Sequence, residues 1–175
     1  MVPRVRILAL ALALVSAGCA ARGPDMSGAV LHGEDLRARN LKRANLTDVD
    51  LERAILADTD LTRQELHSVR RLNGAVLRGA NLQGADLTRM DLREVDLSGA
   101  SLAGASLAAA DLLHANLEGA DLRHADFTQA NLFRARLRGS RYDSLTRWPD
   151  VSFRPQNYGA EPVSPSGSAG HVAGA

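Results

Sequence analysis

The sequence predicts an all-β solenoid, in which short strands wind into a coil with four sides and twenty residues per turn. Two observations predict this fold class. From Leu77 to Tyr142 a large apolar residue returns at every fifth position, and the residue two places before it is alanine in eleven of fourteen cases. Glycine returns every twenty residues in one series, at Gly79, Gly99, Gly119 and Gly139, and in a second series at Gly84 and Gly104.

A five-residue period excludes the two common regular elements. On an α-helix, five residues rotate the side chain by about 500°, so successive leucines would form no apolar stripe. On one long strand, an odd period would put alternate leucines on opposite faces. The chain must therefore turn between leucines. Each pentapeptide then forms one side of a coil, with leucine and alanine pointing to the axis and coils stacked ~4.8 Å apart.

The residues around each leucine indicate how the corners are made. The two glycine series predict that two of the four corners favour a positive φ or a tight turn. Asp, Asn or Ser stands immediately before most of the leucines. Because these residues recur on every side, we expect them to bind backbone groups at the corners and not to form paired carboxylates or a metal site.

Six of the pentapeptides carry a family signature: ADLTR, ANLQG, ADLLH, ANLEG, ADLRH and ANLFR. They resemble the pentapeptide repeat family, whose motif is A(D/N)LXX. The resemblance covers residues 29–144 and implies a right-handed quadrilateral β-helix. It implies little about activity, because the family includes many functions.

The N-terminal segment is predicted to be a targeting signal at residues 1–18, with Arg4 and Arg6 before an apolar run that is too short to span a bilayer. Cys19, the only cysteine, follows Ser16, Ala17 and Gly18, which resembles a bacterial lipoprotein signal. That resemblance implies acylation of Cys19, a membrane-anchored lipoprotein on the periplasmic or extracellular face of the cell envelope, and a tether at residues 19–28. An ordinary cleaved secretory signal is the alternative.

The repeats are predicted to form two blocks, at residues 29–61 and 73–144, separated by a short helical insertion at residues 62–72. Leu61 and Leu77 are sixteen residues apart instead of fifteen, so the register shifts by one. Thr62 and Glu65 fit a capping box for a helix over residues 63–70. We expect Glu34 and Arg39, which replace inward alanines, to lie at the open N-terminal mouth.

The C-terminal residues are predicted to close the solenoid. Four of the six aromatic residues fall within seventeen residues at the end of the repeats, namely Tyr142, Trp148, Phe153 and Tyr158. An open solenoid end exposes core side chains, so we expect residues 145–159 to form a cap in which these rings cover the core. Residues 160–175 are rich in Pro, Ser, Gly and Ala and are predicted to be a disordered tail.

Stacking by twenties predicts which side chains share an outer column. Arg93, Leu113 and Phe133 form one column, in which two large apolar residues face outward; this is the candidate partner surface, with a local irregularity as the alternative. Two other columns have mixed charge: Glu94, His114 and Arg134, and Arg78, Ser98, Glu118 and Arg138. The sequence leaves open whether the solenoids form a homodimer end to end or by the Leu113 and Phe133 column.

No motif predicts catalysis, a cofactor site or a metal site. His114 and His124 are assigned to opposite sides, and the other histidines lie in other segments, so no zinc site is expected. We interpret the chain as a non-enzymatic interaction or scaffold module that binds an unknown protein partner and the membrane. The alternative is a DNA mimic that binds DNA gyrase, as some pentapeptide repeat proteins do. After residue 18 the chain has 19 Lys and Arg against 20 Asp and Glu, so neither a DNA mimic nor a nucleic-acid-binding protein is favoured.

Overall fold

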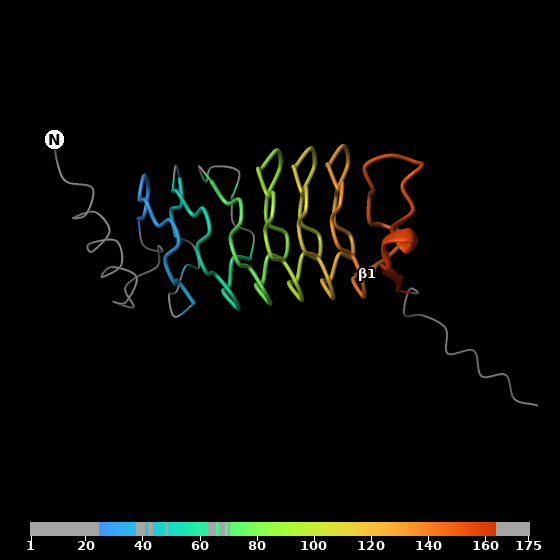
Figure 1. Cartoon of the computed structure of the whole chain (residues 1–175), viewed down its shortest axis with the longest axis horizontal. Coiled ribbons are helices and arrows are strands. Elements are labelled where there is room, and N and C mark those ends of the chain that lie inside the picture. The colour runs from blue at the N-terminus through green and yellow to red at the C-terminus, as the bar shows by residue number, and fades with distance from the viewer. Residues whose placement is uncertain are drawn as a thin grey trace, which may run out of the picture.

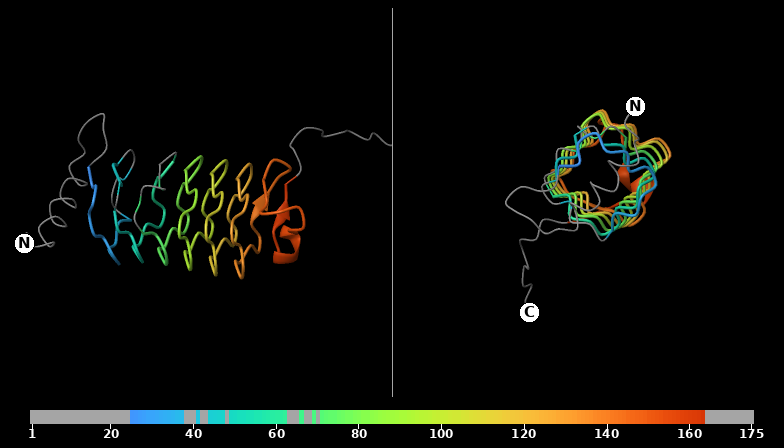
Figure 2. Two further views of the ribbon diagram at one scale, coloured as in Figure 1. Left: turned by 90° about the horizontal axis from the view of Figure 1, so that it is seen from above. Right: turned by 90° about the vertical axis from the view of Figure 1, so that its left-hand side faces the viewer.

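The computed structural model describes residues 25–37, 41, 44–47, 49–62, 66, 69 and 71–163. These residues form a rod of stacked coils, with the first coils at one end and the aromatic segment at the other (Figure 1). Viewed along the rod, the coils superpose to give a four-sided outline (Figure 2). Among the described residues, no helix is long and apolar enough to cross a membrane.

Parallel bridges between successive coils define the four faces, and each side contributes one bridging residue. Face 1 is bridged from Asp25 to Asn45 and from Asp86 through Ser106 and Asp126 to Arg147. Face 2 is bridged from Val30 through Asp50 to Arg71 and from Asp91 through Asp111 to Asn131. Face 3 runs through Asp35, Ile55, Val76, Asp96, Asn116 and Arg136, and face 4 through Asp60, Asn81, Ser101, Asp121, Arg141 and Glu161.

The core is the column of leucines and alanines predicted from the five-residue period. Each repeat leucine from Leu72 to Leu137 is at most 4 % exposed, and the inward residues from Ala75 to Ala135 are at most 6 % exposed. Burying a leucine side chain contributes about 2 kcal/mol. The small alanine leaves room for the leucines of the other sides. Phe127 takes a leucine position and is fully buried.

Each side ends in a tight turn that begins at the leucine. The carbonyl of Leu97 accepts the N–H of Ala100 (3.0 Å), and Gly99 between them has φ of 65°. A positive φ at the third residue is the geometry of a type II turn. Among the described residues, the turn occurs at corners of all four faces, and nine non-glycine residues have positive φ, including Ala109 and His114. The prediction of two such corners was therefore wrong, because the turn imposes this φ whichever residue occupies the corner.

The first repeat begins before the predicted boundary at residue 29. Asp25 bridges to Asn45, and the Met26 N–H donates to the Asn45 carbonyl (3.0 Å). Met26 is 1 % exposed and takes the place of a leucine. Residues 25–28 therefore belong to the coil and not to the tether. The leucine period did not identify this repeat, because methionine occupies its leucine position.

The register shift of the insertion is present between Asp60 and Arg71, because the bridges from Asp50 to Arg71 and from Asp60 to Asn81 span 21 residues. Most of the predicted helix lies outside the described residues, although Leu66 and Val69 are buried. The Thr62 hydroxyl, expected to cap that helix, donates to the Asp60 carboxylate (2.6 Å). At the N-terminal mouth, Glu34 is half-buried; Arg39 lies outside the described residues.

The named elements lie at the C-terminal end: strand β1 (Arg141–Tyr142), the 3-10 helix η2 (Pro155–Tyr158) and strand β2 (Glu161–Pro162). Strand β2 pairs in parallel with β1, with Arg141 opposite Glu161. Ala160 is buried, as the inward alanines before it are. Residues 160–163 therefore continue the solenoid, and the predicted boundary of the tail at residue 160 was wrong.

The predicted aromatic cap covers the end of the core. Trp148 stacks between Phe127 and Phe153, with ring centroids 5.3 and 5.2 Å apart, and Tyr142 meets its edge at 5.4 Å. Phe153 also stacks on Tyr158 at 4.9 Å. The ring of Phe127 is thereby shielded from water by aromatic side chains that follow it in the chain.

Candidate interaction surface

The aspartates and asparagines before the leucines have a structural role, as predicted. In 14 repeats the side-chain oxygen accepts the backbone N–H two residues later; Asp96 accepts from Ser98 (3.0 Å) and Asn116 from Glu118 (3.2 Å). Because this bond satisfies a backbone donor within the turn, these side chains hold the corners of the coil.

Three of these aspartates are also neutralised by an arginine two residues later. Both nitrogens of the Arg93 fork contact Asp91 (2.7 and 2.6 Å), and Arg123 binds Asp121 in the same way (2.8 and 2.6 Å). The side-chain hydrogen bonds from these arginines lower the pKa of Asp91 and of Asp121. The equivalent bond from Arg37 lowers the pKa of Asp35 to about 2.

The candidate column on face 2 is built by backbone bonds between successive coils. The Arg93 carbonyl accepts from Gly74 (2.8 Å), the Leu113 carbonyl from Glu94 (3.0 Å), and the Phe133 carbonyl from His114 (3.1 Å). Phe133 is 62 % exposed, whereas Leu113 is half-buried and Arg93 is exposed.

The environment of this column has mixed charge, because Arg93 binds Asp91 and lies 3.8 Å from Asp111. The Arg134 guanidinium lies 5.3 Å from the centre of the Phe133 ring. A cavity of about 210 Å³ lies beside Leu113 and is lined by Arg53, Asn73, Gly74, Arg93, Glu94, Leu113 and His114. Gly74 helps to leave this space open, because it has no side chain between the coils. Together, the column and the cavity offer one exposed aromatic ring beside arginines.

A second polar cluster on face 2 was missed by the sequence reasoning. The side chains of His32, Asp50 and Glu52 converge, with ligand atoms within 4.8 Å of one another. Arg71 from the next coil lies 3.5 Å from Asp50 and 3.3 Å from Glu52. One arginine thus already supplies positive charge to both carboxylates, and the cluster reads as an ion-pair network. The cluster was not predicted because each histidine was considered only as a co-ligand of other histidines. His32 and Glu52 are twenty residues apart and therefore lie in one column of the solenoid.

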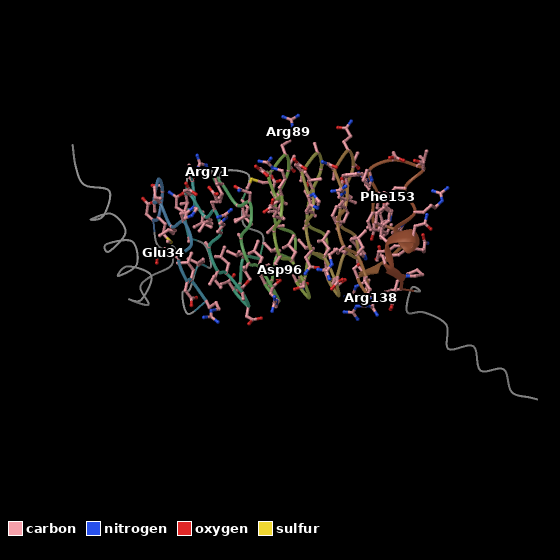
Figure 3. All side chains as sticks on the ribbon, in the orientation of Figure 1. Glu34, Arg71, Arg89, Asp96, Arg138 and Phe153 are labelled. Atoms are coloured by element: carbon pink, nitrogen blue, oxygen red, sulfur yellow. The ribbon has the colours of Figure 1, made fainter. Side chains whose placement is uncertain are left out.

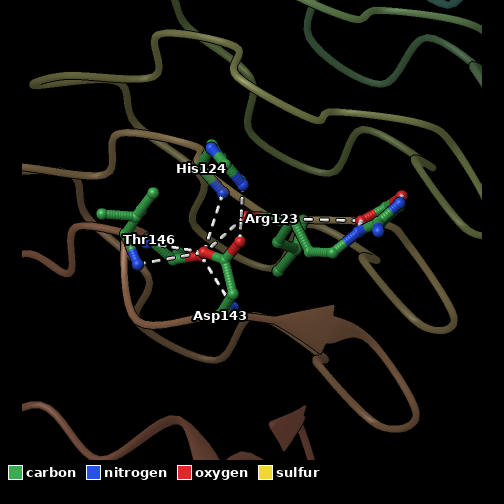
Figure 4. A network of polar contacts seen from close by, with 7 residues as sticks. Arg123, His124, Asp143 and Thr146 are labelled. Atoms are coloured by element: carbon green, nitrogen blue, oxygen red, sulfur yellow. Dashed lines mark hydrogen bonds and ion pairs between the residues drawn. The ribbon is translucent and has the colours of Figure 1, made fainter. Parts of the chain in front are cut away.

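The closing segment contains a third polar cluster, around Asp143 (Figure 4). One carboxylate oxygen accepts the N–H groups of His124, Leu145 and Thr146, each at 3.1 Å, and the other lies 2.8 Å from the His124 ring. In regular coils a backbone carbonyl receives the bond that His124 donates here. Asp143 substitutes for that carbonyl where an extra residue enters the coil, since the bridge from Asp126 to Arg147 spans 21 residues.

Cys19, the predicted lipidation residue, lies outside the described residues. The described residues do place Arg93, Leu113 and Phe133 in adjacent coils on one face. The best-exposed member, Phe133, belongs to the coil just before the aromatic cap.

The repeats of the chain match a known family model. A family model described as pentapeptide repeats matches in eight copies, over residues 25–63, 71–107 and 100–139. The pentapeptide repeat protein Rfr23 from the cyanobacterium Cyanothece 51142 is 29% identical, covering 76% of this chain and 69% of that chain, with a TM-score of 0.42. HetL from Nostoc sp. strain PCC 7120, involved in heterocyst differentiation regulation, is 28% identical, covering 68% and 69%, with a TM-score of 0.47. QnrB1, a plasmid-mediated fluoroquinolone resistance protein, is 18% identical, covering 81% and 76%, with a TM-score of 0.36. No curated protein sequence matches the chain.

Proposed function

Since the chain belongs to the pentapeptide repeat family, we propose that it is a non-enzymatic interaction or scaffold module of the bacterial cell envelope, anchored by a lipid on Cys19. Members of this family are generally structural or interaction modules. The observation that carries the proposal is the structural role of the recurring polar side chains. In the described coils, the regular aspartates and asparagines accept backbone N–H groups of their own turns. What the rod offers a partner is its outer columns.

The proposed contact is the column of Arg93, Leu113 and Phe133 on face 2. Phe133 supplies an exposed ring, and the lining of the neighbouring cavity includes Arg53 as well as Arg93, which is paired with Asp91. Such a surface fits a protein partner that presents an apolar side chain next to a carboxylate. A lipid anchor would hold this rigid surface close to the membrane and raise its effective concentration there.

Membrane fractionation with a fatty-acid label tests the anchor. We expect wild type to be labelled and membrane-bound, and Cys19→Ser to be unlabelled. An unlabelled wild type that is nonetheless exported would show an ordinary secretory signal. Unprocessed wild type in the cytoplasm would refute the envelope proposal and make gyrase inhibition the next assay.

The substitution Phe133→Glu tests the contact. It places a carboxylate on the exposed column and should weaken capture of a cross-linked partner while leaving the circular dichroism spectrum unchanged. Gln83→Glu is the matched control, because Gln83 is exposed and takes the same position after its leucine on face 4. Equal cross-linking by wild type and both variants would exclude this column as the partner surface.

The alternative, a gyrase-binding DNA mimic, requires a sustained negative potential along the rod. Bidentate arginines neutralise Asp91 and Asp121, and Arg78 pairs with Asp96 (2.9 Å). These pairs remove the surface charge that such mimicry needs, which supports the envelope proposal over the alternative.

A further inference from the structure

Acidic and basic residues are segregated along the second half of the rod. Residues 94–122 contain five acidic residues and no lysine or arginine. Residues 127–142 contain four arginines, Arg134, Arg136, Arg138 and Arg141, and no acidic residue. The solenoid stacks these segments in neighbouring coils, so an acidic band lies directly beside a basic band.

The bands meet on face 3 and at the corner where face 2 turns into it. The corner column runs Glu94, His114, Arg134, one residue per coil. The next two columns run Asp96, Asn116, Arg136 and Ser98, Glu118, Arg138. Two of the three columns therefore read acidic, uncharged and basic in consecutive coils.

Some of these charges are paired within the chain and some are not. Arg136 binds Glu118 (2.8 Å), and Arg78 binds Asp96 (2.9 Å). Within the part of the chain that the structure describes, Glu94, Arg134 and Arg138 form no ion pair, although all three are exposed. The Arg134 guanidinium lies 5.3 Å from the centre of the Phe133 ring. Glu94 and Arg134 thus form no ion pair, two coils or about 10 Å apart in one column, although Glu94 interacts electrostatically with the neighbouring Arg93.

The order of charges along these columns is complementary to that of a second copy of the chain that runs in the opposite direction. If two rods lie side by side in opposite directions, a two-fold axis at the His114 coil brings Glu94 of each chain opposite Arg134 of the other. Asp96 then lies opposite Arg136. Glu118 meets its own copy, but its charge is already neutralised by Arg136 of the same chain.

The far corner of face 3 permits close approach. It consists of glycines from Gly79 to Gly159 at intervals of twenty residues. Added Cβ atoms at Gly99 and Gly139 would meet nothing within 4 Å, so the backbone is open there. Between Gly99 and Gly139 a partner can therefore approach the backbone of this edge, whereas Asp58 lies beside Gly79 and Arg138 beside Gly159.

We propose that the Glu94, His114 and Arg134 column and the adjoining face 3 form an antiparallel two-fold contact with a second copy of this chain. The bridges of face 3 from Asp35 to Arg136 span about 24 Å. A face of this size is smaller than a standard interface, so the dimer is weak and salt-sensitive. The contact adjoins the Phe133 column, because Arg134 lies beside the Phe133 ring and Glu94 and His114 line the cavity next to Leu113. It does not depend on the lipid anchor.

Sedimentation of the purified full-length chain in a density-matched nonionic detergent tests the contact. We expect concentration-dependent dimers in roughly 20 mM salt that dissociate in roughly 500 mM salt. Glu94→Arg and Arg134→Glu should each raise the dissociation constant at least about tenfold, because each places like charges opposite one another twice. The double variant restores both pairs with exchanged signs and should return to within about threefold of wild type.

Arg89→Glu is the matched control, since Arg89 is exposed and projects from the opposite side of the rod to Arg138 (Figure 3). It should leave dimerisation unchanged. A wild type that stays monomeric in low salt, or a double variant as weak as the single variants, would overturn the proposal.

A cross-link gives a second measurement that does not depend on charge. In a Cys19→Ser background, His114→Cys should form a disulfide-linked dimer under mild oxidation, because this position meets its own copy on the axis. Arg89→Cys should not. Equal cross-linking of the two variants would contradict the proposed axis.

Discussion

The corner at Ala109 offers the sharpest test of how the coil turns. Ala109 has φ of 57°, and its N–H donates to the Thr128 carbonyl (2.8 Å). Left-handed backbone costs a residue other than glycine about 1–2 kcal/mol. Ala109→Gly removes this strain. Glycine also raises the entropy of the unfolded chain, which lowers the free energy of unfolding by about 0.5–1 kcal/mol. The net expectation is a gain of about 0.5–1 kcal/mol in the free energy of unfolding.

The neighbouring residue supplies the control. Ala108 is not among the residues with positive φ, so Ala108→Gly relieves no strain. The glycine chain loses more entropy on folding, and the variant should be destabilised by about 0.5–1 kcal/mol. Gly104→Ala, at a corner with φ of 68° and no atom within 4 Å of an added Cβ, should destabilise by about 0.5–1 kcal/mol, because the strain exceeds the gain from the lower entropy of the unfolded chain.

Equilibrium unfolding in urea measures all three variants, and unchanged m-values would show that one transition is being compared. Stacked coils can unfold in parts, so two spectroscopic probes should give coincident curves. If Ala109→Gly destabilises as much as Ala108→Gly does, then corner strain does not limit stability and the reasoning fails.

Three further perturbations test the ion pairs and the cap. Arg123 lowers the pKa of Asp121, so their pair stabilises above the unfolded pKa of about 4 and is lost as pH falls through the lower folded value. The stability lost in Arg123→Gln should therefore be greater at pH 7 than at pH ~2, and a pH-independent loss in urea titrations would contradict this. Trp148→Ala removes the ring between Phe127 and Phe153 and should lower the free energy of unfolding by about 3 kcal/mol; a loss below about 1 kcal/mol in the same assay would show that the cap does not protect the core. Arg71→Ala leaves the buried Asp50 carboxylate without its cation and should cost about 1–2 kcal/mol at pH 7, an effect that Asp50→Asn in the same chain should reduce; additive losses would refute the coupling.

The sequence alone determined the architecture of the coil. A leucine every fifth residue, with alanine two before it, can be buried only if the chain turns between leucines, which requires a solenoid. The glycine interval gave the number of sides, and the sixteen-residue step from Leu61 to Leu77 located the extra residue. These features are local and repeated, so one chain contains many independent copies of the signal.

The tertiary structure decided what depends on contact between coils. The turn hydrogen bond set the positive φ of Ala109, and pairing with the next coil showed that Met26 begins the solenoid and that Ala160 is still part of it. Whether a coil takes 20 or 21 residues determines which side chains stack, and therefore placed Arg71 against Asp50 and the Asp143 carboxylate against the His124 N–H. The five-residue motif does not encode these pairings, because each motif has the same local structure whichever coil lies beside it.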